Sequence, residues 1–231
     1  MLRATFLPFA DALSALVGRV DPARAWSFAQ EGEDLVLRRH LEDRRSGFYV
    51  DVGAHHPRRF SNTLHFYERG WRGINIEPSP DAFALFNRAR PRDVNLSLGV
   101  SERPGRLTYY VFSDPALNTF DESLKKDREA HTPYRVVGTT KIAVDRLESI
   151  LEKHLPQGQR IDFMSIDVEG LDLQVLRSND WQRFRPEFVL VEALDFRLEQ
   201  AAGHPIHLFM HEIGYELVAK TLNTLFYRDR K

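Results

Sequence analysis

The segment Gly47-Phe48-Tyr49-Val50-Asp51-Val52-Gly53-Ala54 decides how this chain is expected to fold. It is a short apolar run of the kind that forms a buried β-strand, and it stops at a glycine. A glycine at a strand end lets the backbone come close to a ligand, and open α/β sheets bind their ligands beyond the carboxyl ends of the strands. The segment therefore predicts one strand of a ligand-binding parallel sheet.

Further strand and helix patterns alternate along the chain. We predict strands over residues 73–78, 93–100, 106–112, 161–168 and 188–192, and helices over residues 62–69, 79–90, 139–155 and 171–177. Residues 215–219 and 224–227 predict a closing antiparallel hairpin. Short apolar strands separated by helices are typical of an α/β fold, in which helices cover both faces of a parallel sheet.

The length of 231 residues argues for one large domain or two small ones, and the lack of a convincing linker favours one. Residues 1–26 predict an N-terminal helical extension, and residues 27–231 predict one domain. Inside this domain, residues 113–138 are largely polar and show no clear period. We interpret them as a lid-like insertion over the sheet.

The composition argues against several classes of protein. The 32 basic and 33 acidic residues nearly cancel, which disfavours nucleic acid as the main partner. The absence of cysteine excludes disulfides, thiolate metal sites and thiol nucleophiles, and it fits a cytoplasmic protein. No run of 18 apolar residues is present, so we expect no transmembrane segment. A homo-oligomer is left open.

Three residues predict a site for an adenosine-containing cofactor. Glu77 ends the strand after Asp51 and Gly53, close to the spacing at which an acidic residue binds ribose hydroxyls. A dinucleotide pyrophosphate needs three glycines, and here only Gly53 is present. Asp51 can pair with an ammonium group. S-adenosylmethionine is the common cofactor that fits this description.

Several motifs, taken in order, resemble the FkbM family of S-adenosylmethionine-dependent methyltransferases. They are Ser27-Phe28-Ala29-Gln30-Glu31-Gly32-Glu33-Asp34, Gly47 to Ala54, Phe66 to Pro78, Asn118 to Asp121, Ile166-Asp167-Val168-Glu169-Gly170 and Thr221-Leu222-Asn223. The stretch Phe66-Tyr67-Glu68-Arg69-Gly70-Trp71-Arg72-Gly73-Ile74-Asn75-Ile76-Glu77-Pro78 is the most specific of them.

The resemblance implies a Rossmann-like class I methyltransferase fold, with a seven-stranded, mostly parallel sheet whose last strand is antiparallel. It implies O-methylation, frequently of sugar hydroxyls in polysaccharide or glycosylated-metabolite pathways. The acceptor is then a small molecule or a glycan. The chain departs from the family pattern at His55 and at Lys220-Thr221, and both departures concern the acceptor pocket.

The family resemblance and the start of the helix predicted over residues 62–69 predict further residues that bind the cofactor. The family pattern places Gln30 beside the cofactor, although this segment also reads as a helix N-terminus with acidic residues. Ser61, Asn62 and Thr63 begin a predicted helix and could hold the methionine carboxylate or simply cap the helix. The remaining members of the predicted cofactor set are Ala54, Pro78 and Gly99.

Asp167, Glu169 and Glu192 lie at neighbouring strand ends and raise the catalytic question. Three close carboxylates are costly unless a cation, a proton or solvent relieves them. One alternative is a divalent metal, Mg²⁺ or Mn²⁺, held by all three. The other is a metal-free site in which Asp167 or a histidine acts as the base.

His55 and His56 follow the glycine turn, and we name His56 with Asp167 and Glu169 as catalytic candidates. Two other functions remain as alternatives. A dinucleotide-dependent oxidoreductase or epimerase is disfavoured by the missing glycines, and a non-catalytic binding module would use the same fold as a scaffold.

Overall fold

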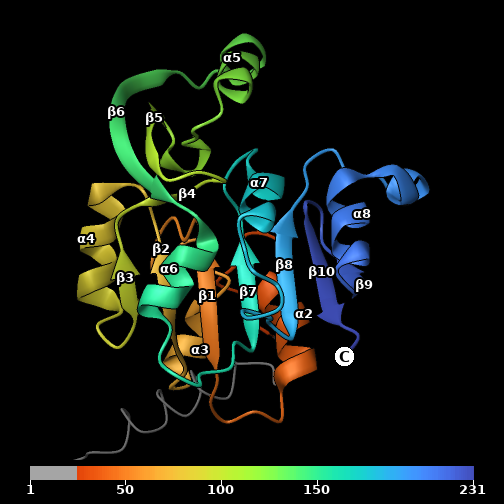
Figure 1. Cartoon of the computed structure of the whole chain (residues 1–231). Helices are drawn as coiled ribbons and strands as arrows, with labels where there is room; N and C mark the ends of the chain where they lie inside the picture. Colours follow the sequence, from red (N-terminus) through yellow and green to blue (C-terminus); the bar gives the residue numbers. More distant parts are fainter. Residues whose placement is uncertain (1–24) are drawn as a thin grey trace, which may run out of the picture.

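A seven-stranded sheet forms the centre of the molecule (Figure 1). The computed structural model describes residues 25–231, so nearly all of the predicted N-terminal extension lies outside the described residues. The strand order is β3-β2-β1-β7-β8-β10-β9. The strands are β1 (Phe48–Val52), β2 (Arg72–Ile76), β3 (Val94–Leu96), β7 (Phe163–Ile166), β8 (Phe188–Glu192), β9 (Tyr215–Lys220) and β10 (Thr224–Asp229).

The direction of the strands confirms the predicted class I methyltransferase arrangement. Strands β3, β2, β1, β7 and β8 run parallel, and β10 pairs antiparallel with both β8 and β9. The predicted closing hairpin is therefore present. Its last strand, β10, is inserted between β8 and β9 rather than added at the edge. The strand β1 has a hydrogen-bonded neighbour on each side, and helices cover both faces of a parallel sheet. All five residues of β1 are therefore buried.

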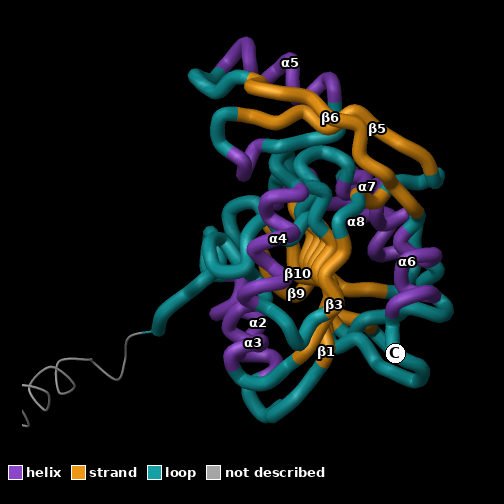
Figure 2. The backbone as a smooth tube through the Cα atoms, turned by 90° about the vertical axis from the view of Figure 1, so that its left-hand side faces the viewer, coloured by secondary structure: helices purple, strands orange, loops and turns teal. Residues whose placement is uncertain are grey.

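Helices cover both faces of this sheet, as the alternation of side chains along β1 requires (Figure 2). Val50 and Val52 face α6 (Leu147–His154), α7 (Asp172–Arg177) and α8 (Pro205–Glu212). Tyr49 points to the opposite face, where α2 (Glu33–Leu41) and α3 (Leu64–Glu68) pack. The Asp51 side chain emerges on the same face as Tyr49, beside Asn75 and Ser165 in the register.

A second, three-stranded sheet stands beyond the carboxyl ends of the parallel strands (Figure 1). It consists of β4 (Gly99–Val100), β5 (Gly105–Phe112) and β6 (Val136–Asp145) in the order β4-β6-β5. Between β5 and β6 lie the short 3-10 helix η1 (Pro115–Leu117) and α5 (Glu122–His131). The segment from β5 to β6 is called the insertion below.

The predicted helix over 139–155 is wrong in its first half. Residues 139–145 belong to β6, and only 147–154 form α6. The β-branched residues of this stretch pair with β5, for example Thr140 opposite Tyr109. That partner lies about thirty residues earlier in the chain, so local periodicity could not reveal it. The single strand predicted over 93–100 is likewise two strands, β3 and β4, which belong to different sheets.

The helix α5 was missed within the region predicted to lack regular structure. Asp121 caps its start, because its carboxylate accepts hydrogen bonds from the backbone N–H groups of Ser123 and Leu124. The pairs Glu122–Lys126 and Lys125–Glu129 join successive turns. Arg128 is the only residue of this helix that is buried. With a single buried position, and a charged one, the helix has no apolar stripe from which it could be predicted.

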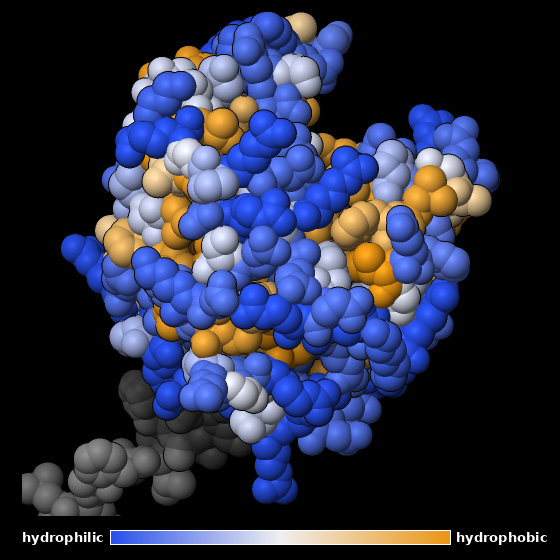
Figure 3. All heavy atoms as spheres, in the orientation of Figure 1, coloured by the Kyte–Doolittle hydropathy of each residue, from blue (hydrophilic) through white to orange (hydrophobic). Residues whose placement is uncertain are grey.

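Three features lie around the sheet. The hydroxyl of Ser79 caps the start of α4 (Pro80–Ala89). The 3-10 helix η2 (Leu198–Gly203) precedes α8. The surface is notched between the insertion and the part of the molecule around α8, and hydrophobic residues show in the notch (Figure 3). Within residues 25–231, no helix is long and apolar enough to cross a membrane.

Gly53, the residue after β1, lies directly against the backbone of Asp167, the residue after β7. Its φ of 80° lies in the left-handed region, and an added Cβ would lie 1.7 Å from the carbonyl oxygen of Asp167. The backbone beyond β1 is held there, since Gly53 N–H donates to Ile76 O at 2.9 Å and Asp167 N–H donates to Val52 O at 3.0 Å. Only glycine satisfies both the dihedral angle and the space.

We expect Gly53→Ala to lower the free energy of unfolding by at least about 2–3 kcal/mol, from the left-handed backbone and the clash together. Urea denaturation followed by circular dichroism measures this. Gly138→Ala is the control, because Gly138 lies in β6 with nothing within 4 Å of an added Cβ. Equal stability of the two variants would contradict the close approach.

Candidate active site

A cavity lies between the carboxyl ends of the parallel strands and the insertion. It encloses about 1090 Å³ of space not filled by protein atoms, part of it open to solvent. Its floor comes from residues that follow β1, β2, β7 and β8, and its roof includes Pro115, Ala116, Asn118 and Phe120 of the insertion. Open α/β sheets bind their ligands at this edge, where the strand order reverses around β1 and β7.

The structure brings most of the predicted site residues together around this cavity. The predicted residues in its lining are Gln30, Asp51, Gly53, Ala54, Asn62, Glu77, Pro78, Gly99, Asp167, Glu169 and Glu192. Three predicted residues do not line it, namely His56, Ser61 and Thr63.

Ser61 and Thr63 support the cavity wall from behind. The hydroxyl of Thr63 donates to Asp51 Oδ2 at 2.9 Å, and the hydroxyl of Ser61 accepts from Leu64 N–H at 3.1 Å. The sequence left two roles open for Ser61, namely binding of the methionine carboxylate and capping of the helix. Its hydrogen bond to the first residue of α3 fits the second role. Thr63 orients the Asp51 carboxylate. Burial raises the pKa of Asp51 to about 6, and the Thr63 hydrogen bond opposes that rise.

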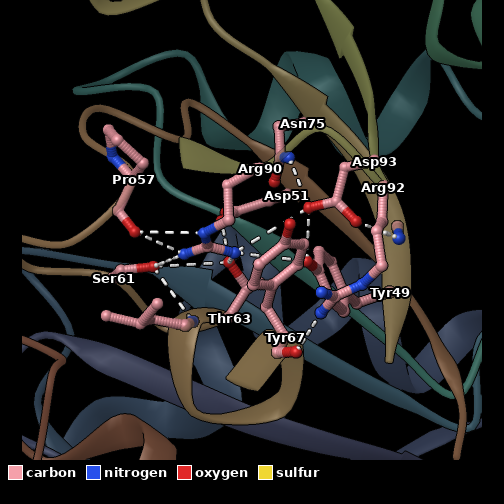
Figure 4. Close-up of polar contacts among 12 residues, drawn as sticks. Tyr49, Asp51, Pro57, Ser61, Thr63, Tyr67, Asn75, Arg90, Arg92 and Asp93 are labelled. Carbon is pink, nitrogen blue, oxygen red and sulfur yellow. Dashed lines mark hydrogen bonds and ion pairs between the residues drawn. The ribbon is translucent and has the colours of Figure 1, made fainter. Parts of the chain in front are cut away.

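A fully buried arginine, Arg90, holds this wall in place (Figure 4). Its guanidinium donates to Pro57 O from Nε at 3.1 Å and from Nη2 at 2.6 Å. It also reaches the hydroxyls of Ser61 at 3.0 Å and Thr63 at 3.4 Å. One cation therefore fixes the loop after Gly53 and the hydroxyl that orients Asp51.

The charge of Arg90 is balanced by Asp93, which is itself held by the second strand. Their closest atoms are 3.9 Å apart, and neither side chain is exposed. The Asp93 carboxylate accepts from the hydroxyl of Tyr49 at 2.6 Å, from Gly73 N–H at 2.9 Å and from the Asn75 amide at 3.0 Å. The sequence analysis did not identify this network, because Arg90 reads simply as the polar end of a predicted helix.

Glu77 is fixed by two backbone donors. Its Oε1 accepts from Ser79 N–H at 2.7 Å, and its Oε2 accepts from His55 N–H at 2.8 Å. Burial raises the pKa of Glu77 to about 7, against the effect of these hydrogen bonds. Each carboxylate oxygen keeps a further lone pair that can accept from a ligand hydroxyl.

The two histidines after the glycine turn have different positions. His55 lines the cavity, and its Nε2 is buried without a hydrogen-bond partner among the described residues. His56 lies outside the cavity lining, and its Nδ1 accepts from the backbone N–H groups of Arg58 and Arg59 at 3.0 Å each. Burial is the largest cause that lowers the pKa of both imidazoles. His56 thus serves the loop, and His55 is the histidine that faces the cavity.

The N-terminal segment and the β9–β10 hairpin close one end of the cavity together. Both Glu31 oxygens accept from Asn223, one from its backbone N–H at 2.8 Å and the other from its amide at 2.7 Å. Thr224 donates to Glu33 at 3.2 Å. Glu31 was not among the predicted site residues, although Glu31 and Asn223 each lie in a motif on which the family resemblance rests.

Aromatic side chains line the part of the cavity beside Gly99. The rings of Tyr109 and Phe120 lie 4.7 Å apart between centroids, and both belong to the cavity lining. A Cβ on Gly99 would come within 2.7 Å of the Phe120 ring. The absence of a side chain at Gly99 therefore lets this ring from the insertion close over the strand end.

Asp167, Glu169 and Glu192 form a compact acidic cluster, called the carboxylate trio below. Each offers an oxygen, and these oxygens lie within 4.8 Å of one another. Burial is the main cause that raises the pKa of all three, and for Asp167 and Glu192 the repulsion from neighbouring carboxylates adds to it. The pKa of Glu192 rises to about 9.

The insertion supplies the cation next to this trio. Arg128, buried at the end of α5, forms an ion pair with Glu169 and donates to Leu117 O at 2.7 Å. Thr119 also donates from its hydroxyl to Glu169 O at 2.8 Å. Glu169 has a φ of 56°, a left-handed conformation that costs a non-glycine residue free energy. The insertion therefore holds Glu169 from both its backbone and its side chain.

The cavity therefore has buried acids at the ends of several parallel strands, and the carboxylate trio is among them. The family profile of the methyltransferase FkbM domain matches residues 51–217. The chain belongs to the FkbM methyltransferase family. This membership confirms the family that was recognised from the motifs.

One curated relative is Methyltransferase sdnD of Sordaria araneosa. It is 27% identical to this chain over 139 residues, which are 48% of this chain and 54% of that protein. The chain thus spans about half the length of the curated relative that it matches.

Two solved structures resemble the fold at low sequence identity. The 1,6-didemethyltoxoflavin-N1-methyltransferase of Burkholderia thailandensis, with bound 1,6-didemethyltoxoflavin and S-adenosylhomocysteine, is 15% identical with a TM-score of 0.44, over 96% of this chain and 87% of that one. The O-methyltransferase of Bacillus cereus in complex with S-adenosylhomocysteine is 11% identical with a TM-score of 0.40, over 94% and 88%.

We expect Arg90→Met to lower the free energy of unfolding by about 3–5 kcal/mol, because Asp93 and the Pro57 carbonyl then remain buried without their cation. Urea denaturation measures the loss. Arg88→Met is the matched control, since Arg88 is exposed and lies only two residues earlier, at the same helix end. A loss no greater than that of the control would show that Arg90 is dispensable for the wall.

Proposed function

We propose that this chain transfers the methyl group of S-adenosylmethionine to a hydroxyl of a sugar, a glycan or a glycosylated metabolite. One observation carries the proposal. A single cavity joins a buried acid suited to ribose, a glycine turn without a pyrophosphate site, and a cluster of carboxylates. Membership of the FkbM family supports the cofactor class.

The cofactor residues of the proposal act as follows. Glu77 accepts from the ribose hydroxyls with the lone pairs that Ser79 and His55 leave free. Asp51 uses the oxygen not taken by Thr63 to bind the ammonium of the methionine moiety. Tyr109 and Phe120 provide the aromatic surface for adenine. The remaining lining residues of the predicted set, Gln30, Ala54, Asn62, Pro78 and Gly99, shape the space around the cofactor.

The reaction that we propose is an in-line displacement. The bond between the methyl carbon and the sulfonium sulfur breaks as a bond to the acceptor oxygen forms, and the sulfur leaves as a neutral thioether. The hydroxyl proton goes to a carboxylate, for which Asp167 is the first candidate, because its raised pKa gives it a greater affinity for a proton. Orientation of the two reactants is expected to supply much of the rate.

A divalent metal fits the carboxylate trio only in part. The donors are all oxygen, which suits Mg²⁺ or Mn²⁺, and they lie close enough together. Arg128, however, already pairs with Glu169, so the third ligand is engaged in this arrangement. No step of the proposed reaction therefore passes through a metal.

The wider assignment rests on the same proposal. The acceptor is a small molecule or a glycan and not nucleic acid, because the 32 basic and 33 acidic residues of the chain nearly cancel. We place the protein in the cytoplasm from its lack of cysteine. A dinucleotide oxidoreductase or epimerase remains the runner-up, and the first experiment separates the two.

Isothermal titration with S-adenosylmethionine and with NADH tests the cofactor. We expect binding of the first and none of the second. We also expect Glu77→Gln to weaken S-adenosylmethionine about 10–100-fold, the usual loss for a hydrogen bond to a charged group. Glu68→Gln is the matched control, because Glu68 is exposed at the end of α3. Binding of NADH alone would refute the proposed function.

Titration of Mn²⁺, followed by electron paramagnetic resonance, tests the metal. We expect weak binding to the wild-type protein and at least about tenfold tighter binding to Arg128→Gln, because that change frees the third carboxylate. Lys126→Gln on the exposed side of the same helix serves as the control. Tight Mn²⁺ binding by the wild type would restore the three-carboxylate metal site.

A further inference from the structure

Negative charge dominates the cavity, but most of it is already satisfied within the protein. Among residues 25–231, seven carboxyl groups line the cavity, and no lysine or arginine does. Five of the seven accept hydrogen bonds or ion pairs from named protein groups. These five are Glu31, Glu33, Asp51, Glu77 and Glu169.

Asp167 and Glu192 are the two that remain. Neither carboxylate has a hydrogen-bond or ion-pair partner among residues 25–231, and Glu192 Oε2 is fully buried from solvent. Their oxygens lie within 4.8 Å of each other in the cavity lining. Arg128, the nearby buried cation, is engaged with Glu169. Burial and mutual repulsion disfavour the ionised forms of Asp167 and Glu192. A positive charge bound beside them stabilises both ionised carboxylates, so binding of a cation there is favourable.

The position of this pair follows from the order of the strands. Glu77 follows β2, Gly53 follows β1, Asp167 follows β7 and Glu192 ends β8, in that spatial order along the edge. The Asp167 backbone touches the Gly53 turn, since an added Cβ on Gly53 would meet Asp167 O at 1.7 Å. A cofactor held by Glu77 at its ribose extends along this edge from β2 toward Asp167.

We propose that Asp167 and Glu192 recognise the positive charge on the cofactor sulfur, so that the cavity binds the sulfonium form and rejects the neutral thioether product. This inference rests on the proposed function. Methyl transfer removes the charge from the sulfur while the two acids stay in place. The reaction thereby weakens the binding of its own product, S-adenosylhomocysteine, which helps the cavity to empty.

Isothermal titration with defined cofactor probes tests the inference without any acceptor. The protein is treated with a chelator, so that no divalent cation occupies the trio. We expect S-adenosylmethionine to bind at least about tenfold more tightly than S-adenosylhomocysteine, which corresponds to about 1.4 kcal/mol. Sinefungin, which carries an ammonium group where the cofactor carries its methylated sulfur, should bind within a few-fold of S-adenosylmethionine.

The variant Glu192→Gln separates charge recognition from a structural role. We expect it to weaken S-adenosylmethionine and sinefungin about tenfold and to leave S-adenosylhomocysteine within about twofold. Glu199→Gln is the control, because Glu199 is exposed on η2. Asp167→Asn takes the place of Glu192→Gln if the latter does not fold by circular dichroism.

Each result has one reading. Equal or tighter binding of S-adenosylhomocysteine by the wild type overturns the inference, as does an equal loss for all three probes in the folded variant. Failure of the wild type to bind any of the three probes overturns the proposed function instead. Selective loss of the charged probes supports the inference.

Discussion

The buried guanidinium of Arg90 is the interaction on which the cofactor side of this molecule depends. A cation with no exposed surface is tolerated only where its donors are matched, and here they meet Pro57, Ser61, Thr63 and Tyr49, with Asp93 close by (Figure 4). The same contacts fix the loop after β1 and orient Asp51 through Thr63. The contacts that bury the charge of Arg90 are therefore the same contacts that order the cavity wall.

The acidic side chains at the two ends of the cavity are stabilised by different groups. The end near Glu77 is stabilised by backbone N–H groups, which supply partial positive charge without a side chain. The end near Glu169 depends on the insertion, whose Arg128 reaches the trio from α5. The insertion also contributes Tyr109 and Phe120. The insertion is therefore part of the cavity lining.

The accuracy of the sequence prediction follows the range of the interactions. The strand β1 and its glycine turn were predicted because a buried parallel strand is a local apolar run. The β5–β6 pairing and α5 were not, because the first needs a partner far along the chain and the second buries only Arg128. The sequence named His56 as the catalytic candidate, whereas His55 is the histidine that lines the cavity. The backbone turn decides which of two adjacent side chains faces the cavity, and the sequence pattern does not show it.

The sequence by itself determined the sheet, the glycine at its edge, the acids Asp51, Glu77, Asp167 and Glu192, and the family, because each follows from local residue types in order. Tertiary structure alone decided which charges are paired. In the sequence, Arg90 looks like the polar end of a predicted helix and Arg128 like one of many polar residues in 113–138, yet one supports the wall and the other neutralises Glu169. The physical reason is that the energy of a charge depends on its burial and its neighbours, and both are set by contacts between distant segments.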